Sequence, residues 1–173
     1  IRDVIIILNK HKESIRHYFE SGAMEAMLRQ QGKEHLLNDL EELRKKTKIT
    51  FVYQEEQRGL GHAILCAKDI VKHDVAILFG DAVTRGKKTG TEELQGVYKE
   101  MNASVMGLER TTPEEVHLRG MVDGKQCGER LWKVEQIVER PKTFPTTLAS
   151  SARYILKKKI LERDLSLFFL FLI

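Results

Sequence analysis

One polar loop contains residue types that suit contact with a flat aromatic ring. It is Gln54-Glu-Glu-Gln-Arg-Gly-Leu-Gly61, between a β-branched run and a segment with helical periodicity. The Gln54 amide offers both a hydrogen-bond donor and an acceptor, and glycines let the backbone approach a ring closely. These features favour recognition of a nucleobase. A turn followed by an ordinary helix start is the alternative, because glycine is common there.

A carboxylate follows the apolar run at residues 75–79. Gly80 comes directly after this run, and Asp81 is next. Mg²⁺ prefers oxygen ligands and often bridges one or two carboxylates to substrate phosphates. Asp81 is therefore a candidate magnesium ligand. The alternative is an aspartate that only begins a turn.

An acidic and a basic residue stand side by side where a later β-like run ends. Glu139 and Arg140 are followed by Pro141. A carboxylate accepts hydrogen bonds from hydroxyls and a guanidinium pairs with phosphate, so this pair suits a phosphorylated sugar. An exposed charge pair at a strand end is the alternative.

Three other residues that often carry chemistry are expected to be structural. His62 follows the glycines of the loop but is not part of an evident nucleophile and base arrangement. Cys66 lies on an apolar helix face and Trp132 lies in a β-like region, where packing is the simpler role.

Alternating apolar runs and helix-period segments predict the elements that position the candidate residues. Strands are expected at Asp3–Leu8, 50–53, 75–79 and 103–108, and helices at 12–20, 33–46, 60–71 and 94–101. This order is typical of a parallel sheet with crossover helices, where ligands bind beyond the carboxyl ends of the strands. We therefore expect Gln54, Asp81 and Glu139 to surround a single cleft.

Beyond Glu109 the chain changes to shorter β-like segments at 120–123, Leu131–Glu139 and 152–156. We expect them to extend the same sheet in a mixed, partly antiparallel way. The predicted fold class is thus α/β, with a mostly parallel Rossmann-like sheet and flanking helices. No repeat or linker divides the chain, so residues 1–164 are expected to form one domain and 165–173 an apolar tail.

The composition fits a soluble globular domain. The 173 residues are 42% hydrophobic and 31% charged, which excludes the disordered and collagen-like classes. Twenty-nine basic and 25 acidic residues give a formal net charge of +4, too small to indicate binding to nucleic acid. Cys66 and Cys127 lie far apart without a metal-binding pattern, which favours reduced thiols in a cytoplasmic protein.

Both ends of the chain indicate an incomplete protein. Ile1-Arg2-Asp3 has no initiator methionine or signal-peptide pattern, so we expect the fold to begin upstream. The apolar residues 165–173 are too few for a membrane-spanning helix, which needs about 20 residues. We expect a truncated or misread end there, with burial in a missing part of the protein as the alternative, and no membrane partner.

Five motifs, each present once, lie in a definite order between Asp3 and about Leu156. They are Gln54-Glu-Glu-Gln-Arg-Gly-Leu-Gly-His-Ala-Ile-Leu-Cys-Ala-Lys68, Ala76-Ile-Leu-Phe-Gly-Asp81, Arg119-Gly-Met-Val-Asp123, Val138-Glu-Arg-Pro-Lys142, and Leu148 to Leu156, which ends in Ala-Arg-Tyr-Ile-Leu. In order and spacing they resemble the bacterial UTP-glucose-1-phosphate uridylyltransferases, a family of sugar nucleotidyltransferases. The resemblance implies a nucleotide-diphospho-sugar transferase fold and transfer of a uridylyl group from UTP to glucose 1-phosphate, giving UDP-glucose and pyrophosphate.

The resemblance also implies roles for single residues. Gln54 and the backbone of Gly59 would bind the uracil, and Asp81 would hold a catalytic Mg²⁺. Gly120 and Glu139 would contact the glucose.

Arg140, expected with Asp81 to be catalytic, would stand where the family has a lysine that faces the sugar phosphate. The family resemblance further implies a cytoplasmic enzyme of carbohydrate metabolism, with a homo-oligomer left open.

The sequence departs from the family in several places. The first strand and the Gly-x-Gly-Thr-Arg loop that cradles the triphosphate are missing, as is a later region with a second metal carboxylate. Arg119 stands where a tyrosine is usual, and Thr147 where an asparagine is usual. Losing one transition-state donor typically costs about 10²- to 10³-fold in rate, so we expect weak or no transfer activity from this chain alone.

Two alternatives to uridylyl transfer remain. One is another sugar-1-phosphate nucleotidyltransferase, such as a thymidylyltransferase, which competition between UTP and dTTP would distinguish. The other is a non-catalytic remnant that binds a nucleotide or a protein partner, or a broken copy that binds nothing.

Overall fold

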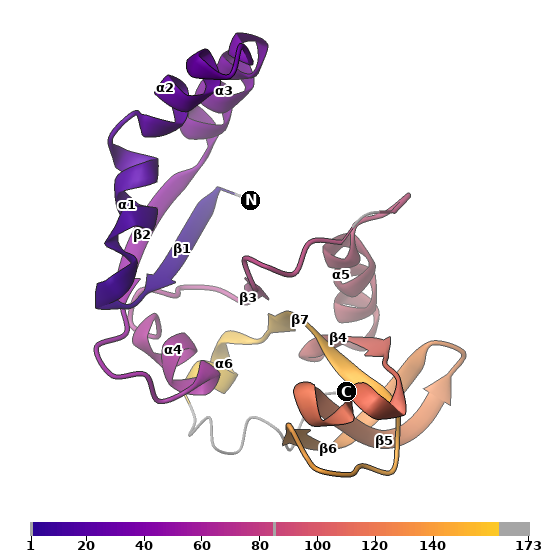
Figure 1. The fold of residues 1–173 in the computed structure, drawn as a ribbon. Helices are drawn as coiled ribbons and strands as arrows, with labels where there is room; N and C mark the ends of the chain where they lie inside the picture. The colour runs from indigo at the N-terminus through magenta and orange to yellow at the C-terminus, as the bar shows by residue number, and fades with distance from the viewer. Residues whose placement is uncertain (1, 85, 163–173) are drawn as a thin grey trace. The chain divides into compact units, whose positions relative to one another are not determined.

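The computed structural model describes residues 2–84 and 86–162 of the chain (Figure 1). The chain divides into two compact units, Ile1–Ile70 and Val71–Ile173. Both units contain strands and helices, so the α/β class expected from the sequence is confirmed. The apolar tail expected at 165–173 lies outside the described residues, and the single domain expected at 1–164 stays a prediction.

The first unit is built on two parallel strands. β1 (Asp3–Leu8) pairs with β2 (Lys48–Tyr53) in continuous register, from Asp3 opposite Lys48 to Leu8 opposite Tyr53. A parallel pair needs a long crossover connection, and here it is helical. The crossover consists of η1 (Lys10–Lys12), α1 (Glu13–Glu20), α2 (Ala23–Gln30), η2 (Glu34–Leu36) and α3 (Leu37–Lys46) (Figure 1).

Aromatic contacts hold the crossover against the strands. The rings of Phe19 in α1 and Phe51 in β2 lie 6.3 Å apart between centroids, and Arg16 Nη1 donates to the Tyr53 hydroxyl at 3.2 Å. Sequence periodicity did not predict α2, because this short helix starts only three residues after α1 ends. Gly22 makes the break at a φ of 71°, a left-handed conformation that favours glycine.

The second unit contains a five-stranded sheet around β7 (Leu148–Leu156). β3 (Val75–Leu78), β4 (Val105–Arg110) and β5 (Gly120–Gly128) all pair with β7 in antiparallel fashion, and β6 (Leu131–Glu139) pairs with β5 likewise. β3 and β4 therefore run in the same direction, as expected, but β7 pairs with both. The sequence predicted β7 only as part of an antiparallel extension. In the structure β7 is the strand to which β3, β4 and β5 all pair.

Three helical elements accompany this sheet. α5 (Gly90–Met101) packs against β4 and β7, and begins with a capping box in which Thr89 and Glu92 satisfy each other's backbone N–H groups. η3 (Pro113–Leu118) precedes β5, and α6 (Lys158–Leu161) follows β7. Within the described ranges no helix has the length and apolar character needed to cross a membrane.

The core of the second unit lies along β5 and β7. Met121, Ala149 and Leu156 have no exposed surface, and Val105 and Leu161 are almost fully buried. Phe144 packs against Val116, Met121 and Ala149. These apolar contacts fix the strand ends that carry the candidate site residues.

Asp74 connects the start of β3 to two helices. Its carboxylate accepts hydrogen bonds from the Tyr98 hydroxyl in α5 and from the Lys158 backbone N–H in α6, the latter at 2.8 Å. These bonds, with the Tyr98 contact foremost, lower the pKa of the Asp74 carboxyl. Burial, followed by the bond to Asp74, raises the pKa of Tyr98 to about 12.

We expect the Asp74 contacts to make stability depend on acid pH. A lowered pKa in the folded chain means that ionised Asp74 stabilises the fold above about pH 4 and that this contribution is lost as pH falls further. Melting curves of the wild type and Asp74→Asn should therefore differ at pH 6 and converge toward pH 3. A difference that stays constant over this range would contradict the account.

Two glycines should respond in opposite ways to replacement by alanine. A Cβ on Gly124 would lie 2.1 Å from the Lys133 carbonyl oxygen in the neighbouring strand, whereas a Cβ on Gly96, in the middle of α5, would meet nothing within 4 Å. In urea unfolding, Gly124→Ala should lose about 1–3 kcal/mol through overpacking. Gly96→Ala should gain about 0.5–1 kcal/mol. Equal effects of the two substitutions would be inconsistent with this packing.

Candidate functional site

The backbone of Gln54 is fixed at the end of the β1 and β2 pair. It follows β2 directly, and its N–H donates to the carbonyl of Leu8 at 2.7 Å, which extends the parallel ladder by one bond. Leu8 is buried at the end of β1. The Gln54 side chain is half-buried. The two strands therefore place this amide at their common carboxyl end.

Gly59 gives the loop its conformation. Its φ of 92° and ψ of −179° fall in a region that is essentially restricted to glycine. The residue precedes α4 (Leu60–Cys66), and its carbonyl accepts from Ala63 N–H at 3.1 Å. The same carbonyl accepts from Gln54 Nε2 at 3.1 Å. The structure thus brings Gln54 and Gly59 into direct contact, while their role in binding uracil stays a prediction.

His62 also belongs to this arrangement. Its Nδ1 lies 3.0 Å from Gln54 Nε2, and its side chain is half-buried in the first turn of α4. The sequence did not indicate this contact, since only the folded loop brings two residues eight apart together. The spacing of His62 three residues after Gly59 is the one signal that places it near the loop.

Asp81 lies in a turn just after β3. The turn is held by Phe79 N–H donating to the Ala152 carbonyl at 3.3 Å and by Ala82 N–H donating to the Phe79 carbonyl at 3.2 Å. The Asp81 side chain is exposed and makes no hydrogen bond or ion pair with another described residue. Its carboxylate is therefore available to a ligand.

The donor set around Asp81 fits only one kind of metal site. In residues 2–84 and 86–162 no group of three or more His, Cys, Asp or Glu side chains is arranged to hold a metal ion. Mg²⁺ usually keeps several waters and binds through one or two carboxylates together with substrate phosphates. A single exposed carboxylate suits that mode, in which the substrate supplies further ligands.

Arg153 in β7 supports the residues that follow Asp81, a role that the sequence pattern did not predict. Its side chain is buried, with 6% exposed. Nη2 donates to the Ala82 carbonyl at 2.8 Å and Nη1 donates to Thr84 Oγ1 at 2.7 Å, while Nε has no partner among the described residues. Both acceptors are uncharged. An arginine inside an otherwise small and apolar strand was the sequence signal that could have identified it.

Gly120 and Glu139 meet across the β5 and β6 pair. They are register partners, and Glu139 Oε2 lies 3.0 Å from the position that a Cβ on Gly120 would take. Arg140 follows at a φ of 47°, with its N–H donating to the Arg119 carbonyl at 2.9 Å. Its Nε lies 3.4 Å from Glu139 Oε1 in an exposed ion pair, which contributes little to stability.

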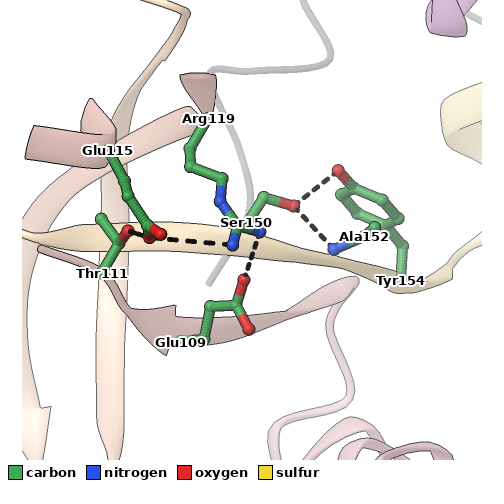
Figure 2. Close-up of polar contacts among 7 residues, drawn as sticks. All are labelled: Glu109, Thr111, Glu115, Arg119, Ser150, Ala152 and Tyr154. Carbon is green, nitrogen blue, oxygen red and sulfur yellow. Dashed lines mark hydrogen bonds and ion pairs between the residues drawn. The ribbon is translucent and has the colours of Figure 1, made fainter. Parts of the chain in front are cut away.

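Two hydroxyl groups lie beside the Gly120 and Glu139 pair. Figure 2 shows Ser150 Oγ facing the Tyr154 hydroxyl, at 2.8 Å, and Ser150 Oγ also accepts from Ala152 N–H at 3.3 Å. Burial is the main cause that raises the pKa of the Tyr154 hydroxyl, and the charge of Glu139 adds to it. Ser150 thus lies next to Gly120, and its hydroxyl is paired with that of the buried Tyr154.

Arg119, which replaces the usual tyrosine of the family, is occupied by acidic neighbours. Its Nη1 lies 2.9 Å from Glu109 Oε1 and its Nη2 lies 3.9 Å from Glu115 Oε2 (Figure 2). Thr111 donates its hydroxyl to the same Glu115 oxygen at 2.7 Å. The arginine is thus held within this surface cluster.

The structure places the six predicted residues in two groups. Gln54 and Gly59 lie in the first unit, and the others lie in the second. Gly120, Glu139 and Arg140 form one cluster, and the Asp81 turn is supported by β7. The expectation of one cleft around all of them stays a prediction.

We expect the fold to depend on Arg153 more than on an exposed arginine. Arg153→Met removes the bonds to Ala82 and Thr84, and should lower the free energy of unfolding by about 1–3 kcal/mol in urea. The matched control is Arg130→Met, because Arg130 is 81% exposed and pairs with Glu93 only at the surface. That change should stay within about 1 kcal/mol. Equal losses in the two variants would contradict this role for Arg153.

Comparison with known proteins extends the likeness over almost the whole chain. The UTP-glucose-1-phosphate uridylyltransferase of Staphylococcus haemolyticus is 34% identical over 166 residues, which cover 94% of this chain and 58% of the relative. The chain therefore spans less than two thirds of that curated protein.

Solved structures agree with this likeness. A UDP-glucose pyrophosphorylase in its apo form shares 25% identity at a TM-score of 0.77, covering 93% of this chain and 61% of the other. A UTP-bound UGPase from Acinetobacter baumannii shares 29% identity at a TM-score of 0.74, covering 94% and 60%. The model of the nucleotidyl transferase family matches residues 1–169. The chain therefore belongs to the nucleotidyl transferase family.

Proposed function

We propose that the protein containing this chain transfers a uridylyl group from UTP to glucose 1-phosphate. The observation that carries the proposal is the 34% identity, over 94% of the chain, to a UTP-glucose-1-phosphate uridylyltransferase. A phosphate oxygen of glucose 1-phosphate attacks the α-phosphorus of UTP. The bond to the β-phosphate oxygen breaks, its electron pair leaves with pyrophosphate, and UDP-glucose remains.

In this proposal Gln54 and the backbone of Gly59 bind the uracil. The loop supports this role because its amide is fixed by Gly59 and His62 before any ligand arrives. Such preorganisation lowers the entropic cost of binding.

The remaining candidate residues bind the sugar and the phosphates. Gly120 and Glu139 contact the glucose, since a glycine opposite a carboxylate leaves room for a hydroxyl donor. Arg140 faces the sugar phosphate with a planar fork in place of the family's compact ammonium group. Asp81 holds Mg²⁺ together with the substrate, and the ion would neutralise phosphate charge.

The proposed setting is the cytoplasm, with UTP and glucose 1-phosphate as partners and neither nucleic acid nor membrane involved. Cys66 and Cys127 are both free, which suits a reducing compartment. The weak positive net charge of +4 offers no extended basic footprint for nucleic acid.

Ligand-dependent stabilisation of the 173-residue chain tests this proposal. With Mg²⁺ present, UDP-glucose and UTP should each raise the melting temperature, because a ligand that binds only the folded state stabilises it. Gln54→Ala should abolish the UDP-glucose shift. Gln126→Ala, which removes an exposed glutamine bonded to Gly128 and Glu129, is the control and should keep it.

Two results would overturn the proposal. One is a folded chain whose melting temperature is unchanged by millimolar UDP-glucose and UTP. The other is a larger shift with dTTP and dTDP-glucose, which would assign the chain to thymidylyl transfer.

A further inference from the structure

We propose that His62 is a positioning residue that fixes the Gln54 amide with its oxygen toward the ligand, and so selects uracil over cytosine. The proposal rests on the proposed function, in which Gln54 contacts the base. His62 thereby gives Gln54 a preference between bases that an amide free to rotate would lack.

The orientation of the Gln54 amide follows from the chemistry of its partners. Nε2 lies 3.1 Å from the Gly59 carbonyl oxygen and 3.0 Å from His62 Nδ1. A carbonyl oxygen only accepts hydrogen bonds, so the amide nitrogen has to face Gly59. An amide NH₂ carries two hydrogens, and these two contacts use both of them.

The contact also defines the state of the His62 ring. Nδ1 can accept from the amide only if it carries no proton, so the neutral ring with its hydrogen on Nε2 is required. A ring protonated at Nδ1 would set two donors against each other. His62 therefore holds the amide in one orientation as long as the ring keeps this tautomer.

Backbone hydrogen bonds hold Gln54, Gly59 and His62 in fixed positions relative to one another. Gln54 N–H is bonded to Leu8 at 2.7 Å, and the Gly59 carbonyl also accepts from Ala63 N–H at 3.1 Å. The glycine-restricted conformation of Gly59 directs that carbonyl to the amide. The amide is thus anchored at its backbone and at both hydrogens of its side chain.

What remains for a ligand is the amide oxygen. Gln54 Oε1 accepts no hydrogen bond from the part of the chain that the structure describes. Uracil and thymine present an N3–H donor to such an acceptor, whereas N3 of cytosine is itself an acceptor and would repel it. Selection between uracil and thymine does not involve this contact.

The first experiment examines the free chain, without any nucleotide. Long-range ¹H–¹⁵N NMR spectra at neutral pH should show His62 with its proton on Nε2 and Nδ1 bare. The two Gln54 amide protons should have shifts displaced from those of a solvent-exposed glutamine, and in His62→Leu the proton that faced Nδ1 should return toward the exposed value. A proton on Nδ1, or Gln54 signals unchanged in His62→Leu, would overturn the inference while leaving the proposed function intact.

The second experiment measures base selection by calorimetry with UDP-glucose and CDP-glucose. The wild type should prefer UDP-glucose by on the order of 10-fold or more, since a good contact becomes a repulsive one. His62→Leu should reduce this preference by about 3- to 10-fold. His62→Asn, whose side-chain oxygen can replace Nδ1 as acceptor, should restore it, and His17→Leu, at an exposed position on α1, should leave it unchanged.

The outcomes separate the two proposals. An equal loss of both affinities in His62→Leu, with the preference preserved, would show a merely structural role and overturn the inference. A wild-type chain that is folded but binds neither sugar nucleotide would overturn the proposed function, and the NMR result would still decide whether His62 orients the amide.

Discussion

Hydrogen bonding along both edges of β7 organises the second unit. β3 and β4 reach β7 at the same residues, Tyr154 and Ile155, so they lie on its opposite edges. This pairing continues past β3, where Phe79 N–H donates to the Ala152 carbonyl and so positions the turn that contains Asp81. The same strand provides Ser150 and Tyr154, and its pairing with β5 positions Gly120. Asp81 and Gly120 therefore depend directly on β7, a late strand in the sequence, and Glu139 depends on it through its partner Gly120.

The sheet of the second unit also contains an unusual feature, a buried charged side chain. Arg153 is an arginine of β7 whose described partners are a carbonyl and a hydroxyl. A buried cation without a paired anion is costly, and such positions are kept where other contacts over-determine them. Here the guanidinium spans from the sheet to the residues after Asp81. Its hydrogen bonds to Ala82 and Thr84 anchor the turn that follows Asp81.

In the first unit, the side chain of Gln54 hydrogen-bonds back to the loop that it begins. The Gln54 amide, just after β2, donates to the carbonyl of Gly59 and to Nδ1 of His62 in the first turn of α4. The amide that remains half exposed has little freedom left. Recognition by a fixed amide is economical because the orientation is set during folding and not during binding.

The sequence alone predicted the elements better than the contacts. Strands Asp3–Leu8 and Leu131–Glu139 were predicted with the observed bounds, since local apolar patterning determines them. The start of β7 at Leu148 was missed, because Ala149 and Ser150 have little intrinsic strand preference and are strand residues only through their distant partners.

The candidate residues show the same division. Gln54, Asp81 and Glu139 were identified because they follow apolar runs, which a linear pattern reveals. Arg153 and the contact between Gln54 and His62 were not, because a side-chain pairing depends on loop closure and on φ and ψ values that no local pattern specifies.

The most direct test of the central claim is a crystal structure of the chain with UDP-glucose. The uracil N3 is expected to lie at about 3 Å from Gln54 Oε1. In the same complex, Nε2 should keep its contacts with the Gly59 carbonyl and His62 Nδ1. A uracil bound away from Gln54, or an amide rotated out of its contact with Gly59, would contradict it.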